Sequence, residues 1–232
     1  MLILVTGASK GIGFEIVKKF SAQPELLVIA VSRNVSSLNS LVKETNSTNI
    51  LPVKADITKA ADVKRIVDTV KKLGLRIDVL INNAGHIVNK PFQKIKPEEL
   101  LSVYATNVFA PFILTQNLIP LLSKKNKAHI VNISSIGGVQ GSSKFPGLSA
   151  YSSSKAALCG LTECLAEEFK GKNIAFNCLA LGAVQTEMLS KAFPGYKAPL
   201  QPKQMAEYIC NFALTGQNYF NGKIISVSST TP

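Results

Sequence analysis

Short apolar runs alternate with segments in which apolar residues recur at helical spacing. The runs are nearly continuous, as expected for strands buried on both faces: Leu2–Thr6, Leu26–Ser32, Ile50–Lys54, Val79–Ile81, Ala128–Ser134, Ile174–Leu179 and Lys223–Val227. The segments between them predict helices over Ile12–Phe20, Val35–Lys43, Val63–Leu73, Tyr104–Leu122, Ser149–Phe169 and Met205–Leu214. This alternation predicts an α/β fold, a doubly wound parallel sheet of Rossmann type with helices on both faces.

The length of the chain suits one domain. Its 232 residues, of which 46% are hydrophobic, are enough to build one large core. The chain contains no internal repeat, low-complexity tract or linker-like boundary. We therefore expect a single domain over residues 1–232.

The ends of the chain carry no targeting signal that we recognise. Leu2–Thr6 already reads as a buried strand, which leaves no room for a signal peptide. No apolar run approaches the roughly 18 residues of a membrane span. The last residues, Ser229–Pro232, match neither a retrieval nor a prenylation signal. We expect a cytoplasmic protein with no membrane partner.

The net charge of +12 favours anionic partners, among them nucleic acid and a phosphorylated cofactor. The lysines are scattered, and no basic run has interleaved aromatic residues, so we expect no nucleic-acid partner. Four cysteines without a C-x-x-C pair, beside only two histidines, argue against a zinc site. Free thiols in a reducing compartment are the simpler interpretation.

A glycine-rich loop joins the first predicted strand to the first helix. Gly7, Gly11 and Gly13 let the backbone turn tightly and approach a bound group closely. The unpaired N–H groups of the following helix and its dipole favour an anion such as a pyrophosphate. Placed directly after a buried strand, the loop predicts dinucleotide binding.

The end of the second strand bears on which dinucleotide binds. NAD-binding domains usually carry an acidic residue about 20 residues past the loop to hold the ribose hydroxyl groups. Here the strand ends in Ser32 and Arg33, and Lys10 lies in the glycine loop. Two cations suit a 2′-phosphate, so the sequence predicts NADP (NADPH).

Further motifs follow in order along the chain. Thr6–Gly13 has the form T-G-x-x-x-G-x-G, Asn82–Gly85 reads N-N-A-G, and Tyr151–Lys155 has the form Y-x-x-x-K. With these motifs in this order, the chain resembles the short-chain dehydrogenase/reductase (SDR) family over nearly its whole length. Among subfamilies it is similar to the small sepiapterin- or benzil-reductase-like carbonyl reductases.

The resemblance implies two sets of site residues. The catalytic set is Asn107, Ser135, Tyr151 and Lys155. The cofactor-binding set is Gly7, Ser9, Lys10, Gly11, Ile12, Ser32, Arg33, Asp56, Ile57, Asn83, Ala84, Gly85, Tyr151, Lys155, Val184 and Thr186. No metal is implied.

Two departures from the family pattern affect the pocket. Leu181–Gly182 replaces the usual Pro-Gly after the sixth strand. The segment between Ser135 and Tyr151 is longer than the commonest family spacing, so we expect residues 141–147 to bulge beside the pocket. Of the two serines that end the fifth strand we prefer Ser135 to Ser134, because it lies three residues after Asn132.

The predicted chemistry is carbonyl reduction. Tyr151 and Lys155 are four residues apart on a helix and share one face. A phenol has a pKa of about 10, and a neighbouring ammonium and the cationic oxidised nicotinamide are expected to lower it. Tyr151 would then exchange a proton with the substrate oxygen, which Ser135 would hold. The resemblance further implies that Lys155 holds the nicotinamide ribose and that Asn107 positions a proton-relaying water.

We therefore expect an NADPH-dependent reductase that converts a ketone, diketone or aldehyde of a small molecule to an alcohol. Two alternatives remain open: an NAD-linked alcohol or steroid dehydrogenase, and a cofactor-sensing regulatory protein without turnover. We also expect a homodimer or homotetramer, because the family pairs its two long helices. Apolar surface for such pairing is available from Phe109, Phe112, Ile113, Leu158 and Leu165.

Overall fold

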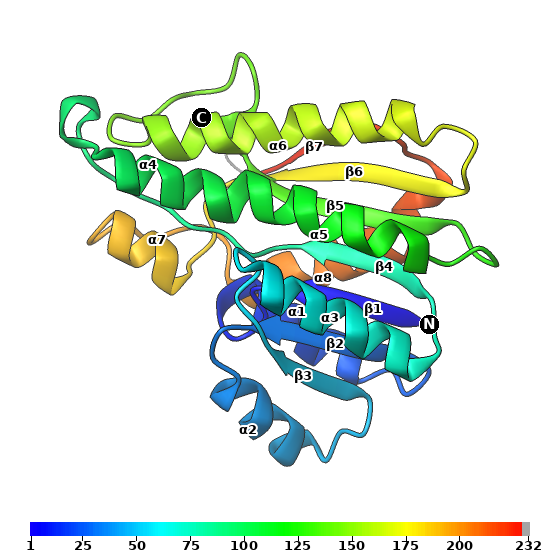
Figure 1. The fold of residues 1–232 in the computed structure, drawn as a ribbon. Helices are drawn as coiled ribbons and strands as arrows, with labels where there is room; N and C mark the ends of the chain where they lie inside the picture. Colours follow the sequence, from blue (N-terminus) through cyan, green and yellow to red (C-terminus); the bar gives the residue numbers. More distant parts are fainter. Residues whose placement is uncertain (229–232) are drawn as a thin grey trace.

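One parallel sheet forms the centre of the molecule. In the computed structural model, which describes residues 1–228, its strands lie in the order β3-β2-β1-β4-β5-β6-β7 (Figure 1). They are β1 (Leu2–Thr6), β2 (Leu27–Ser32), β3 (Ile50–Lys54), β4 (Ile77–Asn82), β5 (Ala128–Ser135), β6 (Ile174–Leu181) and β7 (Ile224–Val227). All neighbouring strands pair in parallel. The predicted doubly wound α/β fold is confirmed.

Helices cover both faces of this sheet. On one face α1 (Gly11–Ser21), α2 (Ser36–Thr45) and α8 (Pro202–Thr215) bury apolar residues against the strands. On the other face α3 (Ala60–Leu73), α5 (Ala110–Leu118) and α6 (Ser149–Glu168) do the same. No helix among residues 1–228 is long and apolar enough to cross a membrane.

The strand order reverses between β1 and β4. Strands β2 and β3 lie on one side of β1, and β4 to β7 lie on the other. In doubly wound folds, ligands bind in the crevice at this point, beyond the carboxyl ends of the strands. The loops that follow Thr6, Asn82 and Ser135 all leave the sheet at these ends. The fold therefore gathers the glycine loop, the N-N-A-G motif and the predicted catalytic serine at one edge.

The helix predicted over Tyr104–Leu122 differs in the structure. It begins earlier, as α4 (Pro97–Tyr104), passes through a π-helical turn (Ala105–Phe109) and continues as α5. The early start has a local cause: Pro97 opens the helix, and the Glu99 carboxylate accepts a hydrogen bond from the N–H of Lys96. Pro120 lacks an N–H group, so the α-helix ends at Leu118 and closes with a 3-10 turn.

A short helix, α7 (Glu187–Ala192), was not predicted. Its N-cap is Thr186, whose hydroxyl accepts a hydrogen bond of 3.2 Å from the N–H of Leu189. None of its residues is fully buried, which is why the apolar pattern gave no signal. Figure 1 shows α7 in orange, on the side of the sheet away from the N-terminus.

Candidate active site

A cavity of about 610 Å³ lies at the carboxyl ends of the strands. It is lined by every residue of the predicted cofactor-binding set and by Ser135. Of all the predicted site residues, only Asn107 lies away from the cavity wall. Residues spread over most of the chain thus meet at the crevice that the strand order defines.

The glycine loop is fixed to the neighbouring β4 strand. The Thr6 hydroxyl accepts hydrogen bonds of 3.1 Å from the N–H groups of Asn83 and Ala84. The Asn83 side chain donates to the carbonyl oxygens of Thr6 and Gly7, at 2.9 and 3.3 Å. A Cβ atom on Gly13 would lie 2.3 Å from the Gly7 oxygen, so only glycine fits there.

The loop suits a pyrophosphate on two grounds. Gly7 and Gly11 adopt φ angles of +66° and +57°, which glycine reaches without strain. The helix α1 begins at Gly11, so its first N–H groups and its positive dipole end face the cavity. The residues present therefore fit a dinucleotide cofactor, as the sequence predicts.

The adenosine end of the cavity contains Arg33 and Asp56. Partial burial raises the pKa of Asp56, but two hydrogen bonds from Thr58 and the positive charges of Arg33 and Lys59 lower it more. The net result is an Asp56 pKa below the usual range, so this carboxylate is ionised at neutral pH. Arg33 is exposed and lines the cavity directly after β2, where a ribose phosphate is expected.

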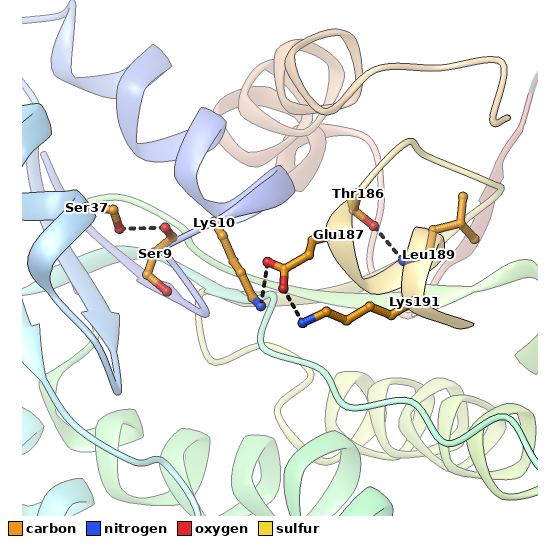
Figure 2. A network of polar contacts seen from close by, with 7 residues as sticks. All are labelled: Ser9, Lys10, Ser37, Thr186, Glu187, Leu189 and Lys191. Atoms are coloured by element: carbon orange, nitrogen blue, oxygen red, sulfur yellow. Dashed lines mark hydrogen bonds and ion pairs between the residues drawn. The ribbon is translucent and has the colours of Figure 1, made fainter. Parts of the chain in front are cut away.

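Lys10 has a partner that the sequence did not suggest. Its ammonium lies 3.0 Å from the carboxylate of Glu187, which also pairs with Lys191. Figure 2 shows this chain of charges crossing from the glycine loop to α7. The two lysines lower the pKa of Glu187 to about 2. Lys10 and Arg33 are the two cations predicted to bind the 2′-phosphate. Lys10 is already paired with a carboxylate, so Arg33 is the one that remains available.

Tyr151 lies on α6 beside Ser135, which ends β5. Burial raises the pKa of Tyr151 to about 12, and a hydrogen bond with the Ser135 side chain opposes that shift. The Lys155 ammonium was expected to lower this pKa, and in the structure it does not. The cause is geometric, because the Lys155 ammonium is 5.8 Å from the Tyr151 ring centre and donates at 2.7 Å to the Ile133 carbonyl. The expected effect of the oxidised nicotinamide stays a prediction.

Lys155 is buried, with 3% of its surface exposed. Burial lowers its pKa to about 8, although the nearby thiols of Cys178 and Cys159 act in the opposite direction. The Ser134 hydroxyl donates to the Lys155 carbonyl at 2.9 Å and is therefore engaged with the backbone of α6. Ser135 lines the cavity too and is hydrogen-bonded to Tyr151; the choice of Ser135 as the catalytic serine stays a prediction.

Asn107 lies in the π-helical turn and is fully buried. Its side-chain oxygen accepts from the N–H of His86 at 2.8 Å, and its amide donates at 2.9 Å to the His86 carbonyl and to the Ser154 hydroxyl. The amide thus joins the loop after β4 to α6. Its predicted role in holding a water molecule stays a prediction.

His86 itself is half-buried rather than solvent-facing. It does not line the cavity, and burial, helped by the charge of Arg33, lowers its pKa.

The two departures from the family pattern have visible consequences. Leu181, in place of proline, continues β6 and pairs with Ser135 on one side and Val227 on the other. The longer segment before Tyr151 turns at Gly141 and Gly147, both with positive φ, and brings Phe145 to the cavity wall. The expected bulge beside the pocket is confirmed.

The fold and this cavity define a nucleotide-binding α/β oxidoreductase. The family model described as short chain dehydrogenase matches residues 1–197. The chain therefore belongs to the short-chain dehydrogenase/reductase family.

Individual relatives agree with this assignment. The chain is 34% identical to a 3-oxoacyl-acyl-carrier-protein reductase of Thermotoga maritima, with 97% of this chain and 94% of the relative covered. It is 31% identical to an NADP-dependent 3-hydroxy acid dehydrogenase of Schizosaccharomyces pombe, over 92% of this chain and 86% of that one.

Solved structures show the same fold. A 3-ketoacyl-acyl-carrier-protein reductase from Brucella melitensis, complexed with NADH, has a TM-score of 0.87 at 27% identity and covers 97% of this chain and 96% of its own. The RhlG/NADP complex from Pseudomonas aeruginosa has a TM-score of 0.86 at 26% identity, covering 98% and 94%. Since the two structures hold different nucleotides, the likeness leaves NAD and NADP open for this chain.

Proposed function

We propose that this protein is an NADPH-dependent carbonyl reductase, acting as one nucleotide-binding domain over residues 1–232. The observation that carries the proposal is the meeting of Tyr151, Ser135 and Lys155 in a cavity whose other end suits a dinucleotide. The nicotinamide cofactor, when bound, supplies the hydride. Val184 and Thr186 would hold its carboxamide, and Lys155 its ribose.

The protein's own groups handle the substrate oxygen. Ser135 holds the carbonyl oxygen by a hydrogen bond and stabilises the negative charge that develops on it. Tyr151 gives its phenolic proton to that oxygen. Burial raises the pKa of Tyr151, so the phenol carries the proton that it gives to the substrate oxygen. The end of β2 favours the reductase over the NAD-linked dehydrogenase, because Ser32 and Arg33 stand where NAD-binding domains usually carry an acidic residue.

The assay that tests the proposal follows the absorbance of NADPH with a set of ketones, diketones, aldehydes and quinones. Oxidation of NADPH that depends on both enzyme and carbonyl compound is the expected result. Tight NADPH binding without turnover on any of them would instead favour the regulatory protein, and turnover only of alcohols with NAD would favour the dehydrogenase.

NADPH is expected to bind on the order of a hundredfold more tightly than NADH. A hydrogen bond to a charged group contributes roughly 1.5–3 kcal/mol, and each 1.4 kcal/mol is about tenfold. Arg33→Ala should erode this preference more than Lys10→Ala, because Lys10 is shared with Glu187 and because an arginine fork donates twice.

Dissociation constants for both nucleotides, measured by fluorescence titration at low and high salt, check the cofactor prediction. Added salt should narrow the gap, since exposed charges are screened. Lys19→Ala is the control, because Lys19 pairs with Glu207 outside the cavity. An unchanged NADPH-to-NADH ratio in Arg33→Ala would refute the role of this arginine.

We also propose a homodimer or homotetramer assembled through α5 and the end of the π-helical turn before it. Phe109, Phe112 and Ile113 expose 49%, 46% and 43% of their surfaces, a run of apolar side chains that association would cover. Of the other candidates from the sequence, Leu158 is buried, and Leu165 is partly buried and packs against the core.

Sedimentation velocity at micromolar concentration checks this assembly. The wild type should sediment above the monomer mass and Phe112→Lys should shift toward it. Leu75→Lys, at an exposed leucine in the loop between α3 and β4, serves as the control. A wild-type protein that sediments only as a monomer would contradict the proposal.

The expected compartment is the cytoplasm. Cys159, Cys178 and Cys210 are buried free thiols, which persist in a reducing environment.

A further inference from the structure

The half of the cavity beyond Tyr151 has apolar and aromatic walls. They are formed by Phe145, Leu148, Met188, Leu189, Phe193 and Tyr196. The first two precede Tyr151 in the bulged segment, and the others belong to α7 and the residues that follow it. A substrate carbonyl that reaches Ser135 and Tyr151 must therefore place the rest of the molecule against these side chains.

Hydrogen bonds from the segment after β4 hold these walls together around one opening of the cavity. The N–H of Lys90 donates to the Gly147 carbonyl at 3.0 Å, and the Asn89 side chain donates to the Ala192 carbonyl at 2.7 Å. The segment after β4 thus links the bulged loop on one side to the end of α7 on the other. The apolar walls are parts of one pocket rather than separate surfaces.

Each charged residue that lines the cavity, among the residues the structure describes, lies at the adenosine end or has a polar partner within the protein. They are Lys10, Arg33, Asp56, Lys155 and Glu187. Arg33 and Asp56 lie at the adenosine end, and Lys10 is paired with Glu187. The Lys155 ammonium donates to the Ile133 carbonyl. Glu187, on the same helix as Met188 and Leu189, has its carboxylate paired with Lys10 and Lys191 (Figure 2).

From this distribution we infer the substrate class, an inference that rests on the proposed function. The site takes uncharged carbonyl compounds with an aromatic or other bulky apolar group beside the carbonyl, and discriminates against the same compounds carrying a carboxylate. An ionised carboxylate would lose its hydration against apolar walls without gaining a cation. Aromatic walls, in contrast, stabilise an aromatic or alicyclic group by contact.

The test uses pairs of substrates that share one ketone and differ in charge. Methyl benzoylformate is compared with benzoylformate, and methyl 4-acetylbenzoate with 4-acetylbenzoate, each with the cofactor saturating. The kcat/KM of the ester should exceed that of the acid by at least about tenfold. The reason is that the carboxylate of the acid would be bound against apolar walls without a partner of opposite charge. Acids reduced as well as their esters, or better, would overturn the inferred class.

A variant with an added cation makes the test specific to charge. Tyr196 lines the wall and is 49% exposed, so Tyr196→Lys can place an ammonium there without burying it in the core. It should raise the acid-to-ester ratio several-fold, mainly by lowering KM for the acid. Tyr196→Met, of similar length and without charge, is the matched control. Equal ratios in the two variants would show that charge does not set the preference.

The outcomes also separate this inference from the proposed function. Reduction of acids and esters alike leaves the carbonyl reductase standing and removes only the substrate class. If neither member of any pair is reduced while other carbonyl compounds of the wider panel are, the substrate class fails alone; if no compound of either set is reduced with NADPH or NADH, the proposed function fails with it.

Discussion

Tyr151→Phe is expected to lower the turnover number by at least the 10²–10⁴-fold typical of general acid–base catalysis. The substitution keeps the ring against α6 and removes only the hydroxyl group that lies beside Ser135. The loss should appear in kcat, because the proton is transferred only in the transition state. Steady-state kinetics with saturating NADPH measure it.

Two measurements make this result specific. NADPH affinity and the thermal unfolding midpoint of Tyr151→Phe should stay close to those of the wild type, since phenylalanine keeps the packing of the ring. Tyr208→Phe, the same change at a tyrosine of α8 outside the cavity, controls for loss of a hydroxyl in general. Turnover near the wild-type value in Tyr151→Phe would remove this residue from the mechanism.

Gly13→Ala should weaken NADPH binding at least tenfold and destabilise the fold. The added methyl would lie 2.3 Å from the Gly7 oxygen and 2.4 Å from the Asn83 amide nitrogen. Overpacking of this kind typically costs about 1–3 kcal/mol. For a chain of this size that lowers the unfolding midpoint by roughly 2–4 °C per kcal/mol. The loop must also move away from its bracing, which displaces the pyrophosphate site.

Calorimetric titration with NADPH and thermal unfolding test the glycine prediction. Lys18→Ala makes an alanine at an exposed position on the same helix and should leave both quantities nearly unchanged. A Gly13→Ala protein with wild-type affinity and stability would show that the loop accommodates a side chain, contrary to the close packing seen here.

The strands could be predicted from the sequence because both faces of this sheet are covered. Residues such as Ile3 and Ile29 are completely buried, so each strand is a nearly unbroken apolar run. The glycine loop and the Tyr151–Lys155 pair could be predicted as well, because neighbouring residues along the chain define them. A feature can be predicted from the sequence when residues close together in the chain form it.

The remaining features depend on contacts that no local pattern records. Lys10 and Glu187 are 177 residues apart, and only the folded chain brings them together. The π-helical turn around Asn107 reflects backbone hydrogen bonding rather than apolar spacing. The pKa of Tyr151 follows from how deeply the fold buries it, whereas the spacing of the motif suggested only that a lysine lies nearby.

The two ends of the cavity differ in how firmly they are held, and this difference affects how the protein can evolve. The glycine loop is held by several hydrogen bonds, whereas α7 is attached mainly by exposed contacts. Asn83 and Thr6 join the glycine loop to the loop after β4 by partly buried hydrogen bonds, so changes there disturb the contact between the two neighbouring strands β1 and β4. The helix α7 has no fully buried residue and joins the glycine loop through exposed charges. Substitutions in α7 can therefore accumulate at little cost to stability. The substrate end of the cavity can therefore change while the cofactor end is kept.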